Sequence, residues 1–136
     1  MELKDKVGIV TCGARGIGEA IVRAYAAEGT SAVIADVETA AADALAKSIG
    51  PKALSARLNV GDAQSIADMT TTVVGHFDRV DILVNDASIF NVGPIDKITE
   101  ADFDRQFVVN VRGLVFETKA IAAQIGNIGP GAAVGA

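Results

Sequence analysis

Short apolar runs rich in β-branched residues alternate along the chain with longer segments in which apolar residues recur every three or four positions. The short runs, at residues 6–11, 31–36, 52–60 and 79–85, predict buried strands. The segments between them predict helices, and Gly29 and Gly50 mark the ends of the first two. Because such alternation favours a parallel sheet covered by helices, the pattern predicts an α/β fold.

Capping residues locate two further helices. Asp62 precedes a segment with an apolar stripe, formed by Ile66, Met69, Val73 and Phe77. Thr99, with Asp102 three residues later, resembles a capping box and predicts one long helix. Its expected inward face comprises Phe103, Phe107, Val111, Leu114 and Ile121. The pattern then stops: residues 126–136 hold four glycines and no charge, which predicts a flexible tail rather than a fifth strand, after one domain over residues 1–125.

Composition narrows the class of protein. The 136 residues are 50% apolar and 21% charged, as expected for one globular domain. A net charge of −5 without any basic run argues against nucleic acid or an anionic membrane as a partner. The single cysteine excludes an internal disulfide, and no metal-ligand cluster is expected. Neither a signal peptide nor a membrane span is apparent, so we expect a cytoplasmic protein.

Residues 10–20, VTCGARGIGEA, predict a strand, a glycine-rich turn and the start of a helix. A phosphate binds well at a helix N-terminus, and Gly13, Gly16 and Gly18 keep side chains out of its approach. The spacing G-x-x-G-x-G differs from the dinucleotide fingerprint G-x-G-x-x-G. The turn alone is therefore equally consistent with a phosphate site and with an ordinary strand-to-helix turn.

Asp36 ends the second predicted strand, 18 residues after Gly18. An acid there can accept both hydroxyls of an adenosine ribose, although an exposed strand-end aspartate is the simpler alternative. Together, turn and acid favour a dinucleotide, and NAD over NADP because a carboxylate repels a 2′-phosphate. Arg15 would favour NADP if its guanidinium paired with the 2′-phosphate. The favoured interpretation of Arg15 is a contact with the pyrophosphate or an exposed side chain.

With these motifs, residues 3–122 resemble the short-chain dehydrogenase/reductase family. The family's T-G-x-x-x-G-I-G turn is matched by TCGARGIG at residues 11–18, in all positions but one. Its Asp-Val pair corresponds to Asn59-Val60, its N-N-A-G motif to NDAS at residues 85–88, and its helical N-V-x-G to NVRG at residues 110–113. The sequence as a whole is most similar to bacterial polyol dehydrogenases of the sorbitol or galactitol type.

The resemblance implies a doubly wound Rossmann-type sheet, truncated after four strands in the order 3-2-1-4. It implies that the cofactor NAD contacts Thr11, Cys12, Gly13, Arg15, Gly16, Ile17, Gly18, Asp36, Asn59, Val60, Asn85, Asp86, Ala87 and Ser88. It also makes Asn110 a member of the family's catalytic tetrad, whereas the simpler alternative is a buried asparagine satisfied by backbone groups.

Four departures from the family pattern affect these expectations. Cys12 replaces a turn glycine, which costs ~1–2 kcal/mol if the position needs a positive φ. Asp86 replaces an amide, and Ser88 replaces a glycine. The family's catalytic serine and Tyr-x-x-x-Lys pair have no counterpart, because the one tyrosine, Tyr25, is followed four residues later by Gly29.

The expected function is therefore the cofactor-binding part of an NAD-dependent oxidoreductase acting on a polyol or another secondary alcohol. The alternative is a non-catalytic dinucleotide-binding or subunit-interaction module, or a truncated product without activity. An open edge at the fourth strand would invite pairing with another chain, so a homo-oligomer is expected.

Overall fold

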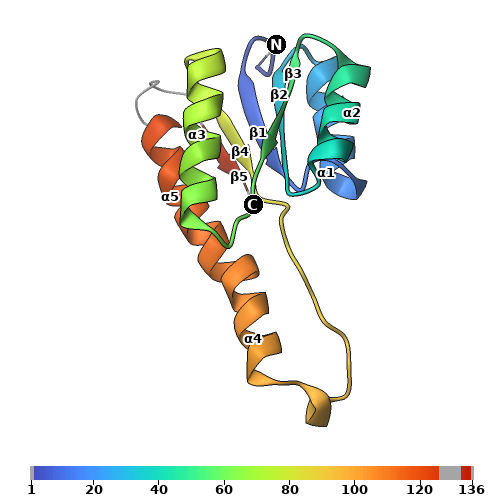
Figure 1. Cartoon of the computed structure of the whole chain (residues 1–136). Helices are drawn as coiled ribbons and strands as arrows, with labels where there is room; N and C mark the ends of the chain where they lie inside the picture. The colour runs from blue at the N-terminus through green and yellow to red at the C-terminus, as the bar shows by residue number, and fades with distance from the viewer. Residues whose placement is uncertain (1, 126–132, 136) are drawn as a thin grey trace.

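The central sheet contains five parallel strands in the order β3-β2-β1-β4-β5 (Figure 1). The computed structural model describes residues 2–125 and 133–135. The strands are β1 (Val7–Thr11), β2 (Ser31–Asp36), β3 (Ala53–Arg57), β4 (Ile82–Val84) and β5 (Ala133–Gly135). The predicted order 3-2-1-4 is confirmed for the first four strands.

β5 corrects the expectation for the end of the chain. Residues 133–135 pair with β4 in parallel, with Ile82 opposite Ala133, so the prediction of no fifth strand is wrong there. β4 is consequently an inner strand and not the open edge that was expected. Ladder pairing uses backbone groups, so an apolar strand edge can accept even a glycine- and alanine-rich segment. The rest of the predicted tail, residues 126–132 and 136, lies outside the described residues.

Helices cover both faces of the sheet (Figure 1). They are α1 (Gly16–Ala27) and α2 (Thr39–Ile49) on one face, and α3 (Ala63–Phe77) and α5 (Leu114–Ile125) on the other. Strand side chains alternate between the two faces. Ile9 and Val33 pack in the core beneath α3 and α5, whereas Val10 and Ile34 pack in the core beneath α1 and α2. None of the helices that the structure describes is both long and apolar enough to cross a bilayer.

Both predicted caps are present. The Asp62 side chain accepts a hydrogen bond of 3.0 Å from the backbone N–H of Gln64 at the start of α3. Thr99 and Asp102 form a reciprocal capping box at the start of α4 (Glu100–Phe107). A short 3-10 helix, η1 (Ile95–Lys97), precedes this cap.

The predicted long helix is in fact three segments, because a π-helical stretch, η2 (Val108–Gly113), separates α4 from α5. Ile121 is fully buried as expected, but Phe103, Phe107 and Val111 are 54%, 51% and 48% exposed. Their predicted inward orientation is wrong, because α4 projects beyond the sheet and has no layer to pack against (Figure 1). The Phe103 and Phe107 rings stack on each other instead, with centroids 4.4 Å apart.

Candidate functional site

The glycine turn joins β1 to α1 at the carboxyl end of the sheet. A Cβ atom at Gly18 would collide with the Cys12 carbonyl, and one at Gly13 would lie 2.8 Å from the Val10 carbonyl oxygen. These two glycines therefore let α1 pack closely on the end of β1. Gly16 differs, because nothing lies within 4 Å of its Cβ position and its φ is +58°. It begins α1 and leaves the helix N-terminus open to an anion.

Cys12 occupies the strained position of this turn. Its φ is +51°, in the left-handed region, as the family's glycine at this position suggests. Burial of the half-buried thiol, together with the negative charge of Asp36, raises the pKa of Cys12. The thiol is thus held in its neutral form, where it is a poor nucleophile.

Thr11 connects the turn to the segment after β4. Its buried hydroxyl accepts hydrogen bonds of 2.9 Å from the N–H groups of Asp86 and Ala87, and it donates to the Val84 carbonyl at 3.4 Å. The hydroxyl thereby uses both of its lone pairs and its single proton. This bonding brings the NDAS segment, residues 85–88, beside the glycine turn.

Asp36 lies at the end of β2 with its carboxylate facing the turn. One oxygen accepts from the Ala14 N–H at 3.2 Å, and the other accepts from the Glu38 N–H at 3.0 Å. Arg15 is directed elsewhere, because its guanidinium forms a 2.8 Å ion pair with Glu38 and is 73% exposed. Each Asp36 oxygen retains a lone pair, so the carboxylate can still accept the two hydroxyls of a ribose.

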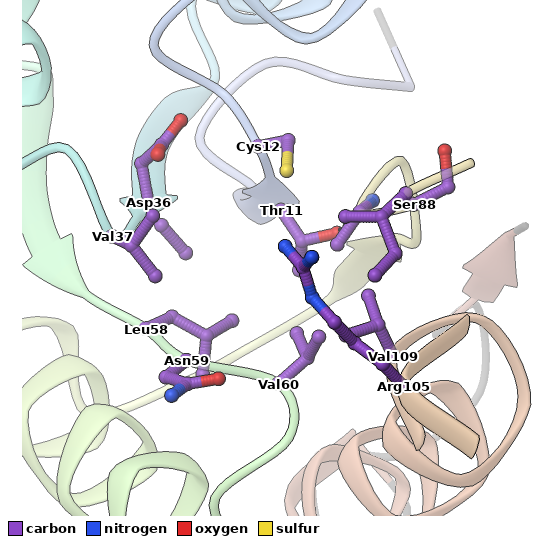
Figure 2. Close-up of a pocket in the computed structure, with 13 residues that line it drawn as sticks. Thr11, Cys12, Asp36, Val37, Leu58, Asn59, Val60, Ser88, Arg105 and Val109 are labelled. Atoms are coloured by element: carbon purple, nitrogen blue, oxygen red, sulfur yellow. Dashed lines mark hydrogen bonds between the residues drawn. The ribbon is translucent and has the colours of Figure 1, made fainter. Parts of the chain in front are cut away.

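A pocket of about 340 Å³ opens between the ends of β1, β2 and β3, the segment after β4, and the last turn of α4 (Figure 2). Seven of the fifteen predicted site residues line it: Thr11, Cys12, Asp36, Asn59, Val60, Ala87 and Ser88. An adjoining, more open hollow lies over the turn and adds Arg15, Gly16, Ile17 and Asp86. Cys12, Asp36 and Ser88 belong to both spaces, so a ligand can extend continuously from one into the other.

Four predicted residues contribute behind the pocket lining. Gly13 and Gly18 pack α1 against β1, as described above. Asn85 donates a 3.2 Å hydrogen bond to the Thr118 hydroxyl on α5. Asn110 accepts from the Ile89 N–H at 2.8 Å and donates to the Ile89 carbonyl at 2.6 Å. Backbone groups thus satisfy the side chain of Asn110, as expected if Asn110 is a structural asparagine. The same two hydrogen bonds connect η2 to the loop after β4.

The sequence analysis missed Arg105, which lines the pocket from α4. No motif or spacing in the sequence indicated it, because Arg105 and Val109 reach the pocket wall only through the position of α4 and η2. Glu117 on α5 was likewise not predicted from the sequence; it is 1% exposed, and its Oε1 has no hydrogen-bond partner among the described residues. Burial raises the pKa of Glu117 to about 8.

A parallel sheet in this order, with a glycine turn after its central strand and an acid at the end of the next, defines a Rossmann-type nucleotide-binding domain. Residues 6–134 match the model of the short chain dehydrogenase family. The chain belongs to this family.

Two bacterial polyol dehydrogenases are among its relatives. Galactitol 2-dehydrogenase of Agrobacterium fabrum is 42% identical over 122 residues, which covers 90% of this chain and 48% of the relative. Sorbitol dehydrogenase of Cereibacter sphaeroides is 41% identical with the same coverage. The solved 3-ketoacyl-(acyl-carrier-protein) reductase from Brucella melitensis, in complex with NADH, superposes with a TM-score of 0.86 at 30% identity, covering 90% of this chain and 51% of that one. The chain therefore spans about half the length of the relatives it matches.

Proposed function

We propose that this chain is the NAD-binding part of a short-chain oxidoreductase that acts, as a complete enzyme, on a polyol or another secondary alcohol. The observation that carries the proposal is the continuous space shared by the glycine turn and Asp36. The nicotinamide of a bound NAD would supply the hydride acceptor. The similarity to galactitol and sorbitol dehydrogenases supports the substrate class, and the NADH complex of the Brucella reductase supports the cofactor class.

Asp36 is the proposed determinant of the preference for NAD over NADP, since its carboxylate would lie where NADP carries the 2′-phosphate. Calorimetry with NADH and NADPH tests this, and we expect NADH to bind more tightly. Asp36→Asn should narrow the difference, and it keeps one side-chain oxygen to accept from the N–H of Ala14 or of Glu38, which Asp36→Ala does not. Arg15→Gln is the matched control. Tighter binding of NADPH by the unmutated chain would overturn the assignment and favour Arg15 as a phosphate contact.

Binding of NADH should be weak because of two residues at the site. Cys12 strains the turn backbone, and Asp86, in the segment after β4, would add a negative charge near the nicotinamide half of a cofactor that already carries phosphates. Cys12→Gly should strengthen binding by up to ~1–2 kcal/mol, because a bound cofactor requires the turn to keep the strained conformation that the free chain can relax. Asp86→Asn should add a further gain that shrinks at high salt. If neither variant binds NADH more tightly, the turn accommodates Cys12 without loss.

The chain alone should not oxidise sorbitol, galactitol or simple secondary alcohols. Oxidation needs a positioned base for the hydroxyl proton, which contributes ~10²–10⁴-fold. Tyr25 cannot serve as this base. It lies on α1 against Gly8, in the core between the sheet and α1 and α2, and burial raises its pKa above the ordinary tyrosine value. Sustained NADH formation by the purified chain that is lost in Asn110→Ala would show that this account of the chemistry is wrong.

A non-catalytic interaction module is the second candidate function, and one observation favours it. Apolar side chains are exposed along α4, η2 and α5, namely Phe103, Phe107, Val108, Val111, Val115 and Phe116. Exposed apolar area on this scale favours contact with another protein surface. We therefore include self-association in the proposal, and sedimentation over a range of concentrations should show oligomers that Phe103→Ser and Phe107→Ser reduce.

A further inference from the structure

Arg105 reaches into the candidate site from the side opposite the glycine turn. It lines the main pocket together with Thr11 and Cys12, and Figure 2 shows its side chain extending from α4 toward that end of the pocket. Among the described residues its guanidinium forms no hydrogen bond and no ion pair, and, besides the hydrogen bonds from Thr99, its positive charge helps to lower the pKa of Asp102 on the same helix. The donors of this group are therefore available to a ligand.

The helix that carries Arg105 is held in place against the opposite wall of the pocket. Asn110 forms two hydrogen bonds with the backbone of Ile89, and the Gln106 side chain accepts a 3.3 Å hydrogen bond from the Asn91 N–H. These three hydrogen bonds tie α4 and η2 to the loop that follows β4. Arg105 is thus carried by a braced segment and does not depend on ligand binding to bring it near the pocket.

The charges around the site show why a further cation is needed there. Three carboxylates line the two joined spaces, those of Asp36, Glu38 and Asp86, against two guanidinium groups. Arg15 is already paired with Glu38. A pyrophosphate carries two negative charges, so it would meet a surplus of negative charge, which the Arg105 guanidinium would reduce.

We propose that Arg105 is a phosphate-binding residue of this site, which pairs with the pyrophosphate of a bound adenine dinucleotide from the α4 side. The inference rests on the proposed dinucleotide function and adds to it a contact outside the family motifs quoted above. The α1 N-terminus approaches the phosphates from one side and the Arg105 guanidinium from the other. A planar guanidinium suits this role because its donors can engage two phosphate oxygens together.

Calorimetry with ADP, adenosine and NADH tests the assignment. Arg105→Gln should weaken the binding of ADP and NADH by about tenfold, since a charge-assisted hydrogen bond is lost, and should leave adenosine within about twofold. Arg105→Lys should recover part of the loss. The affinity of the unmutated chain for ADP should fall more steeply with salt than that of Arg105→Gln.

Arg112→Gln is the matched control. It removes the same charge from η2, the next helical segment, where the Cζ of Arg112 lies 4.9 Å from the centroid of the Phe116 ring, outside both spaces. It should leave ADP binding unchanged. Thermal unfolding of each variant checks that the fold is retained.

The outcomes separate this inference from the function on which it rests. If NADH and ADP bind but Arg105→Gln binds them as tightly as the unmutated chain, the role of Arg105 is wrong and the dinucleotide function stands. If adenosine binding falls as much as ADP binding, the guanidinium stacks on the base and the phosphate assignment is overturned. If the unmutated chain binds neither NADH nor ADP, both proposals fail together.

Discussion

The sheet body (residues 7–84) and the helical arm (residues 100–125) achieve regular structure by different means. All five residues of β1 are buried, whereas α4 has no buried residue at all. The body is held together by side chains packed between helices and sheet, the main source of stability in most proteins. The outer part of the arm depends on a capping box and on one ring pair within the helix. A correct helical pattern therefore does not establish that the helix is packed.

A second contrast concerns one buried acid in each region. Asp81, beside β4, is 2% exposed and accepts hydrogen bonds from the Val7 N–H at 2.8 Å and from the Arg79 guanidinium at 2.9 and 2.5 Å. Glu117, in the arm, is equally buried, but one of its oxygens has no partner in the described part of the chain. The same burial thus accompanies opposite shifts in pKa, downward for Asp81 and upward for Glu117.

The largest effect should come from the packed region. Leu83, at the centre of β4, is fully buried, so Leu83→Ala should lower the free energy of unfolding by about 3–4 kcal/mol. Phe103→Ala removes a larger side chain from an exposed surface and should change the stability of the monomer by less than about 0.5 kcal/mol. Urea unfolding at low protein concentration measures both. Similar losses for the two variants would contradict the contrast between body and arm.

Asp81→Asn should cost about 2 kcal/mol at neutral pH, because it leaves Arg79 without its anionic partner. Burial acts to raise the pKa of Asp81, but hydrogen bonds from Arg79 and from the Val7 N–H outweigh it and hold the pKa below its ordinary value. The carboxylate therefore stabilises the fold above the ordinary aspartate range and loses this contribution on acidification. The stabilities of Asp81→Asn and the unmutated chain should converge as the pH falls below about 4. A constant difference across this range would show that the charge of Asp81 is not the cause.

Glu117 should produce the opposite pH dependence. Its carboxyl is neutral in the folded state up to a pKa of about 8, whereas an unfolded chain ionises it near 4.5. The folded state thus holds one more proton, and stability declines between these two values as pH rises. Glu117→Gln should remove this decline and be about 3 kcal/mol more stable than the unmutated chain at pH 7.5, with near equality at pH 5. Parallel stability profiles for the two proteins would contradict the assignment.

The smallest effect concerns the strained turn in the body. Cys12→Gly should stabilise the fold by about 0.5–1 kcal/mol, because relief of the left-handed conformation is partly offset by the greater freedom of glycine in the unfolded chain. Cys12→Ala is the control, since alanine retains the strain and should give no gain. Urea unfolding measures both variants. A gain in Cys12→Gly alone would attribute the added stability to relief of strain, whereas equal gains would attribute it to loss of the thiol.

Local signals predicted the elements of the body and the start of α4 in the arm. Strand composition, Asp62 as a cap and the Thr99–Asp102 capping box act over a few residues, and each was confirmed. The orientation of Phe103 and Phe107 was not predictable in the same way, because periodicity describes a face but does not say whether another layer covers it. β5 depends on pairing with a strand some fifty residues earlier, which local propensity does not report.

In the candidate site, too, local motifs predicted some residues, whereas others depend on the arrangement of distant segments. The motifs located eleven residues in the two joined spaces, since a strand end and a turn have a fixed relation in this fold. Arg105 and the bonding of Asn110 to Ile89 depend on where α4 lies relative to the loop after β4. No spacing within either segment encodes that relation. Such residues become visible only in three dimensions.

The pairing of β1 with β4 has a consequence for the order in which the chain can fold during synthesis. The Val7 N–H finds its acceptor in Asp81, 74 residues later, whereas β1 pairs with β2 across a much shorter connection. One edge of β1 therefore stays open on the ribosome until β4 has been made and has left the exit tunnel. Contacts between distant segments slow folding, and an open apolar strand is prone to pair wrongly in the interval. Slower elongation between the codons for β3 and β4 would lengthen the time for which that edge is exposed.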